Sequence, residues 1–548
     1  MNPLLWLVGS YAILIGGHYM ARRPIEALWP PDPNRTTPAA EINSGDFSPT
    51  PPAIVLGHYY MSIAGLSPVL SAIAGLYWGW LPALVWMLVA VIFLGATTEY
   101  ITMMGSLRNK GSTFGEITSL TVGKASGIYL TIMLWFLGVL VFSIFSVTMS
   151  NTLIATPMAT IPTLALTFIA VGFGYIRRTK GVALLPSTLI ALAIWSVFIY
   201  IGIQNPVKFS FNTWMTILII YTLIAAYFPI WLVLAPRDYL NAGVLVAGLA
   251  IASIALIIGN PKFSMPMWVG WETARGVLYP ALFATITCGA INCAHSLITA
   301  GTASRMLDNE KNAYPIVSAG TKGETVMALV AIALIASAHD YQAFTSTVVK
   351  NIGGAFSSAF GNAMTYLGLS PEIGAVFGAL TLTGFIITTM DTYARAGRYC
   401  LEELARSVPV CKALRFDIPA VSTLVTVGVG VLIALKTPFM QIWSAYALLS
   451  LTFAIYPYSI AIVNRVKEGK PFDGHFVGWV VVPGAFMALT GAVALLYFIN
   501  RFIKNNQMIP LVVSCFLVVL FVLSLLQLYT RVKFLLDQRK AGGISTSA

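Results

Sequence analysis

A small set of ionisable and hydroxyl side chains lies inside or beside long apolar segments of the chain. The acidic members are Glu99, Asp238, Glu324 and Asp391, and the others are His58, Tyr59, Ser62, Arg237, His295, Ser296 and Arg395. An ionisable residue in such a place is costly unless it has a partner or a task. Carboxylates and imidazoles there can carry a proton or bind a cation, and arginine can hold a carboxylate through two parallel hydrogen bonds. These residues form the candidate site.

Two stretches place small residues beside the histidines. His58 and Ser62 lie in the motif GHYYMSIAG at the start of an apolar segment, which suggests a broken helix whose free backbone groups face a cavity. Residues 285–302, which include His295 and Ser296, form the densest polar stretch inside any apolar segment. Close packing of small residues between helices explains both stretches without a binding site, and this alternative stays open.

The acidic candidates have structural alternatives as well. Glu99 ends an apolar segment, where it either binds a cation, carries a proton or simply lies at the membrane interface. Glu324 is also suited to cap a helix N-terminus, where a carboxylate is favoured. Asp391 and Arg395 are four residues apart, so they can pair with each other on one helix face.

Arg237 and Asp238 form an adjacent charged pair at the end of an apolar segment that contains Pro229 and is followed by Pro236. Proline interrupts the hydrogen-bond ladder of a helix, so this segment is a second candidate for a broken helix. Because arginine recognises carboxylates, Arg237 can hold an anionic substrate. The alternative is a cytoplasmic gate or an anchor that sets the topology.

The composition limits the class of protein. The chain has 548 residues, 9% charged and 57% hydrophobic, and its mean hydropathy is +0.81. A soluble protein carries about 25% charged residues, so the composition indicates an integral membrane protein and excludes a cytosolic enzyme or a nucleic-acid binder. The five cysteines show no metal-ligand spacing, and no nucleophile triad or phosphate loop is recognisable. We expect no enzyme and no cofactor, and leave a bound metal open.

Apolar segments long enough to span a bilayer, roughly 20 residues each, occur about 15 times. Their continuous apolar runs predict helices and not the alternating strands of a barrel, so the expected fold is an all-α polytopic membrane protein. The segments lie near residues 4–19, 54–76, 81–104, 128–148, 161–176, 183–203, 214–234, 240–258, 277–300, 326–338, 373–389, 418–435, 442–463, 477–498 and 509–529.

Lys and Arg residues collect on one side of the predicted membrane. The odd-numbered connections between segments and the C-terminal tail carry most of the 32 basic residues. The exceptions, in the even-numbered connections, are Lys208, Lys262, Arg275, Lys350, Lys436, Arg501 and Lys504. Because cytoplasmic loops are enriched in Lys and Arg, we predict an N-terminus outside and a C-terminus in the cytoplasm. The net charge of +12 then reflects topology and not nucleic-acid binding.

Two connections have more than one interpretation, and no separate soluble domain is visible. The Pro-rich stretch 21–52 either folds against the cytoplasmic face or forms a loosely ordered loop. The Gly-rich stretch 350–369 is either an interfacial or re-entrant piece or a plain connector, and the plain connector is favoured.

Several motifs, in order along the chain, resemble the carbon starvation protein A family, also called the peptide transporter carbon starvation family. They are DPNRTTPAAE, PTPPAIVLGHYYMSIAG, WGWLPALVWMLVAVIFLGATTEY, SLRNKGSTFGEI, LAPRDYL, TITCGAINCAHSLITAGT, and MDTYARAGRY with LEEL. They lie between about residues 24 and 404, and the C-terminal third has no distinctive motif. The family commonly has two adjacent histidines where this chain has His58 and Tyr59, and often Asp where it has Glu99.

The resemblance implies an uptake system for peptides, or for pyruvate in some members, in the inner membrane of a bacterium or archaeon. It also implies the amino acid–polyamine–cation superfamily, and with it a LeuT-like core of two inverted five-helix repeats. We expect the first repeat at residues 54–203 and the second at 204–399. Residues 1–53 and 400–548 would be peripheral, and the broken helices would be the GHYYMSIAG segment and the segment before Pro236.

Isolated carboxylates and histidines near broken helices favour an ion-coupled secondary transporter, with the proton as the expected ion and Na⁺ as the alternative. A passive channel or facilitator and a non-transporting membrane sensor are the rival functions. The expected substrate-binding residues are His58, Tyr59, Ser62, Arg237, His295, Ser296 and Arg395. The expected ion-coupling residues are Glu99, Asp238, Glu324 and Asp391. Beyond substrate, ion and lipid bilayer we expect no nucleic-acid partner, and the sequence does not predict an oligomeric state.

Overall fold

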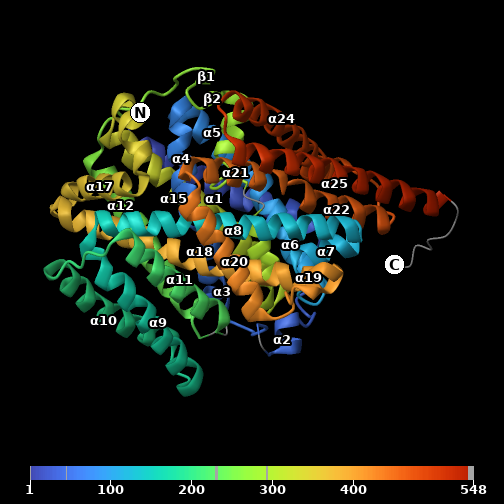
Figure 1. Cartoon of the computed structure of the whole chain (residues 1–548), viewed down its shortest axis with the longest axis horizontal. Coiled ribbons are helices and arrows are strands. Elements are labelled where there is room, and N and C mark those ends of the chain that lie inside the picture. Colours follow the sequence, from blue (N-terminus) through green and yellow to red (C-terminus); the bar gives the residue numbers. More distant parts are fainter. Residues whose placement is uncertain (1, 45, 229–231, 292–293, 541–548) are drawn as a thin grey trace.

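The computed structural model describes residues 2–44, 46–228, 232–291 and 294–540. Almost all of this part of the chain is helical (Figure 1). In the described ranges the strands are limited to β1 (Glu272–Thr273) and β2 (Gly276–Val277), which pair antiparallel. The prediction of an all-α protein is therefore confirmed.

Twelve helical spans in the described residues are long and apolar enough to cross a membrane, or up to 13 if a bent pair is counted as one. The twelve are α1 (Pro3–Leu28), α5–η2–α6 (Trp80–Arg108), α8 (Lys124–Ala155), η3–α9 (Pro157–Lys180), α10 (Leu184–Gln204), α12 (Leu234–Gly259), η5–α15 (Glu310–Ala338), α18 (Pro371–Ser407), α20 (Pro419–Lys436), α21–α22 (Gln441–Lys467), α23–η8–α24 (Gly474–Lys504) and α25 (Pro510–Lys540). The expected count of about 15 is thus not confirmed.

Two of the expected segments are not continuous long helices. Residues 214–234 contribute the shorter helix α11 (Phe211–Tyr227), and α12 already begins at Leu234. Pro236 and Arg237 consequently lie in the first turn of α12 and not in a connection. Pro229, which suggested a break here, lies outside the described residues. Residues 277–300 form α13 (Leu278–Thr285) and α14 (His295–Gly301), with non-helical backbone between them.

The helix break expected at GHYYMSIAG is confirmed. Helix α3 (Pro52–Ala64) ends there, and α4 (Ser67–Gly75) continues at an angle of 47°. Gly65, with φ +36°, makes the bend, a backbone conformation that disfavours side chains. A Cβ at this position would also lie 2.8 Å from the ring of Phe145 in α8, so the bend is closely packed.

The second break, between α13 and α14, leaves carbonyl groups without helical partners, and side chains of neighbouring helices bond to them. Trp86 donates to the carbonyl of Ile286 at 2.8 Å, Ser71 to that of Cys288 at 2.8 Å and Thr325 to that of Gly289 at 2.9 Å. Backbone at membrane depth must find such partners inside the protein. The non-helical backbone between α13 and α14 is therefore stabilised inside the core by hydrogen bonds from neighbouring helices.

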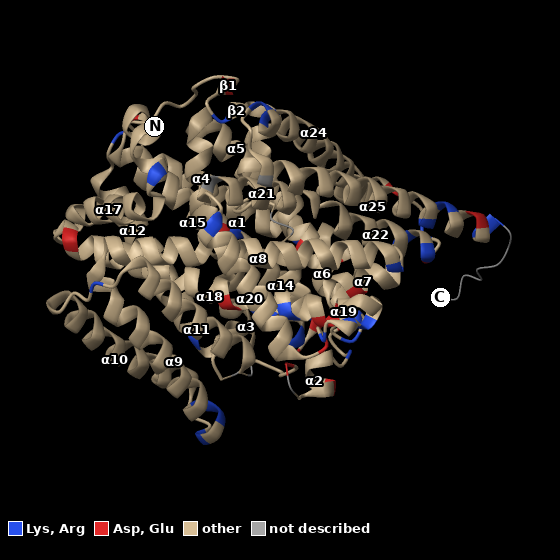
Figure 2. Cartoon of the chain, in the orientation of Figure 1, with Lys and Arg blue, Asp and Glu red and all other residues tan. Residues whose placement is uncertain are grey.

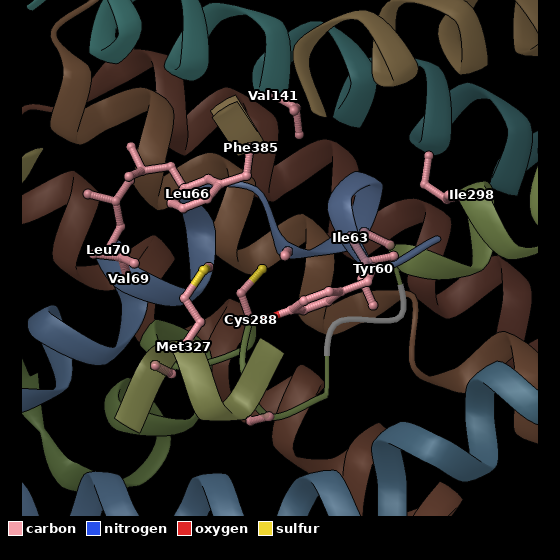
Figure 3. Close-up of a cluster of buried hydrophobic side chains, with 14 of the residues drawn as sticks. Tyr60, Ile63, Leu66, Val69, Leu70, Val141, Cys288, Ile298, Met327 and Phe385 are labelled. Carbon is pink, nitrogen blue, oxygen red and sulfur yellow. The ribbon is translucent and has the colours of Figure 1, made fainter. Parts of the chain in front are cut away.

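Apolar side chains from several helices pack around the two breaks (Figure 3). Leu66 at the bend is drawn beside Phe385 of α18, Val69 follows it in α4, and Cys288 of the second break is drawn beside Met327 of α15; all belong to one buried cluster. All five are buried. This packing keeps both breaks away from lipid and fixes the polar side chains that the neighbouring turns carry.

The long helices α8 and α18 run past each other through the middle of the molecule (Figure 1). A Cβ at Gly138 would lie 3.1 Å from the carbonyl oxygen of Tyr393, so a small residue permits the close crossing. Helix α17 (Ile352–Met364) packs along α18. The favoured interpretation of residues 350–369 as a plain connector is therefore wrong, because a packed helix forms there.

The connection 21–52 folds against the core, which confirms the first of its two interpretations. Helix α1 continues to Leu28, and beyond it Ser48 and Thr50 bond through their backbone N–H groups to the carbonyls of Arg305 and Met306, each at 3.0 Å. The short helix α2 (Pro38–Ile42) lies within this connection. The backbone bonds explain why a Pro-rich stretch is ordered.

Charged residues gather at the edges of the helical core (Figure 2). Basic and acidic side chains surround α2, α7 (Phe114–Thr121) and α19 (Pro409–Ala413), and further basic residues lie at the end of α9. Helices α9 and α10 expose large apolar side chains, such as Phe168 and Leu185, as lipid-facing helices do. The orientation of the termini stays a prediction.

Candidate functional site

The structure brings most of the candidate residues into two buried clusters. The arginine cluster consists of His58, Tyr221, Arg237, Asp238 and Asp391, and the acidic cluster consists of Glu99, Cys288, His295, Ser296, Thr299 and Glu324. Helix α3 contributes to both, because the consecutive side chains of His58 and Tyr59 reach one cluster each. Except for Tyr221, no member is more than 2% exposed.

Arg237 is the centre of the arginine cluster. Its Nη2 donates to Oδ1 of Asp238 at 2.6 Å and to Oδ1 of Asp391 at 3.1 Å, and its Nη1 donates to Oδ2 of Asp391 and to the hydroxyl of Tyr221. Tyr221 in turn donates to Asp391 at 2.7 Å. Helices α11, α12 and α18 thus meet at one guanidinium group, with Asp391 held in the bidentate manner that arginine favours.

His58 extends this cluster towards α14. Its Nδ1 lies 2.7 Å from Oδ2 of Asp238, and its Nε2 lies 3.0 Å from the hydroxyl oxygen of Thr302. Thr302 can give its own hydrogen to the carbonyl of Ile298 at 3.1 Å. Both ring nitrogens of His58 then face acceptors, which is the arrangement that suits an imidazolium.

Formal charges in the arginine cluster balance only when His58 is protonated. Arg237 contributes one positive charge, and Asp238 and Asp391 contribute two negative ones. A neutral His58 leaves one uncompensated negative charge in the core, where an unpaired charge is costly. Protonation of His58 or a bound cation would compensate this charge.

Glu99 lies in α6 (Ala96–Arg108), one turn after the π-helical turn η2 (Val91–Gly95). Its Oε1 accepts a hydrogen bond from Ser296 at 2.9 Å, and its Oε2 accepts from Thr299 and, at 3.3 Å, from Tyr59. In the described part of the chain no Lys, Arg or His pairs with it within 4.0 Å. Glu99 is thus a buried carboxyl group held by hydroxyls alone.

Glu324 lies in the middle of α15, whose helical residues begin at Ala313, so it does not cap a helix N-terminus. Its Oε1 is 3.4 Å from Nε2 of His295, but neither atom has a hydrogen-bond partner among the described residues. The sulfur of Cys288 completes a group of three ligand atoms that lie within 4.8 Å of one another. These three residues are the candidates for holding a metal ion.

Two candidate residues lie elsewhere. Arg395 points away from both clusters: it contacts Asp46 at 3.3 Å and donates to the carbonyl oxygens of Ala225, at 2.8 Å, and Phe228. It therefore holds the C-terminal end of α11, and the pairing of Asp391 with Arg395 is not formed. Ser62 lies at the bend, with its oxygen 3.4 Å from that of Thr392 in α18.

Sequence reasoning missed several members of these clusters. Tyr221 carried no signal, because hydroxyl residues are common in membrane helices, where they usually bond to their own backbone. Thr299 and Thr302 lie inside the polar stretch 285–302 but were not named individually as site residues. Cys288 was interpreted as a small packing residue. Asn292 and Cys293, which belong to the same polar stretch, lie outside the described residues. In the described part of the chain the site contains no serine or cysteine paired with a histidine base.

Comparison with known proteins agrees with the motifs. A family model described as carbon starvation protein CstA matches residues 4–351. The chain is 29% identical to the peptide transporter CstA of Escherichia coli strain K12 over 362 residues, 61% of this chain and 50% of that protein. It is 27% identical to the pyruvate/proton symporter BtsT of the same strain over 351 residues, 60% of this chain and 49% of that protein. The chain spans about half the length of these two relatives.

A solved structure shows the fold. The crystal structure of MhsT in complex with L-phenylalanine aligns with a TM-score of 0.50 at 15% identity, covering 81% of this chain and 97% of that one. The core is thus LeuT-like, with inverted five-helix repeats and peripheral helices. Because the family model spans more than half of the 548 residues, the chain belongs to the carbon starvation protein CstA family.

Proposed function

We propose that the protein is an ion-coupled secondary transporter that imports short peptides or a small carboxylate such as pyruvate across the inner membrane. The names of the two relatives supply both substrate classes. The observation that carries the proposal is the pair of buried clusters, one at the start of α12 and one at the start of α14, joined by consecutive residues of α3. In a LeuT-like fold, substrate and ion sites lie where discontinuous helices expose polar groups.

The proton is the proposed coupling ion because of the charge balance. The arginine cluster needs one proton to be neutral. The acidic cluster contains two carboxyl groups, Glu99 and Glu324, with His295 as its one basic group among the described residues. Buried carboxylates without cations take up protons or bind a cation. His58 and the four acids are the proposed proton-binding groups, and two of the acids, Asp238 and Asp391, also compensate the charge of Arg237.

Arg237 links proton binding to substrate binding. In this conformation Asp238 and Asp391 both form ion pairs with the guanidinium group of Arg237. The Nε–H of Arg237 has no hydrogen-bond partner among the described residues, but both Nη groups are bonded to the two acids. A substrate carboxylate binds the guanidinium group through two hydrogen bonds when one acid gives up its bond, and protonation of Asp238 or Asp391 weakens that bond. The proton and the substrate anion then enter together, as symport requires.

The repeats keep the bounds expected from the sequence, 54–203 for the first and 204–399 for the second. On this proposal, α3–α4 is the discontinuous helix that opens the first repeat and α11–α12 is its equivalent in the second. The break between α13 and α14 then lies inside the second repeat. The predicted orientation, with the N-terminus outside, places α2, α7 and α19 at the cytoplasm and is part of the same proposal.

Uptake into proteoliposomes tests the function. Purified protein is reconstituted, a pH gradient (acidic outside) is imposed, and accumulation of radiolabelled dialanine or pyruvate is measured, each in competition with the other. The proposal predicts accumulation above the external concentration that collapses with a protonophore. Equilibration without accumulation would indicate a facilitator, absence of flux would indicate a sensor, and accumulation that depends on Na⁺ alone would exclude proton coupling.

A further inference from the structure

Three potential metal ligands converge at the second helix break. Cys288 lies in the non-helical segment between α13 and α14, His295 is the first residue of α14, and Glu324 faces them from α15. Their ligand atoms lie within 4.8 Å of one another, and the three residues are at most 2% exposed. No charge balance in the proposed transport cycle requires the cysteine.

His295 and Glu324 face each other at ion-pair distance without an aligned hydrogen bond. Their facing atoms, Nε2 and Oε1, are 3.4 Å apart, and among the described residues both lack a hydrogen-bond partner although both are buried. Metal bonds of about 2.0 Å at a tetrahedral angle place neighbouring ligand atoms about 3.3 Å apart. The observed separation of 3.4 Å is compatible with two ligands on one ion as well as with an ion pair.

The donor set identifies the class of cation. Thiolate, imidazole and carboxylate together are the ligands of zinc and of similar borderline transition metals, whereas calcium and magnesium take oxygen ligands. A divalent cation would balance the thiolate of Cys288 and the carboxylate of Glu324, so the site would be neutral in a core where unpaired charge is costly.

We infer that Cys288, His295 and Glu324 form a binding site for one Zn²⁺-like cation. When the metal is bound, Glu324 is a ligand, and the proton carriers of the proposed cycle are the remaining groups. The site joins the break to its surroundings, because its ligands come from the non-helical segment itself, from the first residue of α14 and from α15. Three protein ligands leave a fourth coordination position open, as in zinc sites that bind an exogenous ligand. Cys288 also lies 3.0 Å from the hydroxyl of Tyr446, which can donate to a thiolate and orient it.

Direct metal binding tests the site independently of transport. The full-length protein in detergent is stripped with a chelator, incubated with Zn²⁺ alone, and analysed for metal per chain. A parallel titration with Co²⁺ reads the thiolate-to-cobalt charge-transfer absorption. We expect one metal ion per chain and a charge-transfer band that Cys288→Ser abolishes, with binding at least about tenfold weaker.

Two further variants keep the test decisive. Cys400→Ser removes another buried cysteine, in α18 and outside the three-ligand group, and is expected to bind metal and show the band as the wild type does. Glu324→Gln is expected to keep the band while weakening Zn²⁺ binding. Absence of stoichiometric metal, or a band that survives Cys288→Ser, would overturn the inference. Metal binding by a protein that transports nothing would leave the site standing and refute the proposed function alone.

Discussion

Removing Arg237 and Asp391 singly and together tests the charge balance of the arginine cluster. With His58 protonated, the wild-type cluster is neutral. Arg237→Met leaves a net charge of −1, Asp391→Asn leaves +1, and the double variant is neutral again because His58 and Asp238 remain as a pair. The two substitutions are therefore expected to be strongly non-additive in the free energy of unfolding.

The magnitude follows from the burial of the pair. Arg237 and Asp391 are at most 1% exposed, and four hydrogen bonds join them, two directly and two through Tyr221. Breaking a buried ion pair by removing one partner costs about 3–5 kcal/mol, mostly because a charge is left unpaired. The double variant leaves no unpaired charge, so the coupling energy of the cycle should be about 2–4 kcal/mol.

Unfolding in mixed micelles, followed by tryptophan fluorescence, measures the four proteins of the cycle. The matched control is the exposed pair Arg22–Glu26 of α1, with a distance of 3.1 Å and side chains 43% and 21% exposed. Arg22→Met with Glu26→Gln should give a coupling of about 0.3–0.5 kcal/mol. If the buried cycle gave no more than this, the reasoning from charge balance would be refuted.

Three other substitutions have distinct expected outcomes. Gly65→Ala should destabilise the protein by about 1–3 kcal/mol more than Gly181→Ala in the same unfolding assay. Both glycines have positive φ, but only Gly65 is closely packed. Equal effects of the two substitutions would show that the bend tolerates a side chain. Tyr221→Phe removes one donor to Asp391 and should cost about 1.5–3 kcal/mol, and an unchanged unfolding curve would contradict this. Glu99→Gln should abolish accumulation driven by a pH gradient while downhill exchange continues, and retained accumulation would exclude Glu99 as a proton carrier.

Much of the architecture is readable in the sequence because hydropathy is a local property. Segments that bury their faces in lipid or in other helices are apolar in composition, so most spans were located. The break between α13 and α14 is hidden in the same pattern, because residues 277–300 are apolar on average whether or not the helix continues. Helix α1 likewise continues past the polar residues Arg22 and Arg23, since α1 packs against α15.

The residues of the candidate site could be identified from their types alone. Their hydrogen-bonding partners could not. Acids and histidines are rare in apolar segments, so His58, Glu99 and Asp238 stood out without structural knowledge. Their partners are far away in the chain: Asp238 follows His58 by 180 residues, and Asp391 follows Arg237 by 154. Local spacing suggested the wrong partner for Asp391, because an i,i+4 pair is possible on any helix, and the structure bonds Arg395 elsewhere.

The proton flux that accompanies substrate entry tests the central claim most directly. Proteoliposomes loaded with a pH-sensitive dye, at equal pH on both sides and with the membrane potential clamped, receive substrate from outside. If the buried carboxyl and imidazole groups carry protons with the substrate, internal acidification should follow substrate entry in a fixed ratio and disappear in Glu99→Gln. Substrate entry at the normal rate with no change of internal pH would contradict the account.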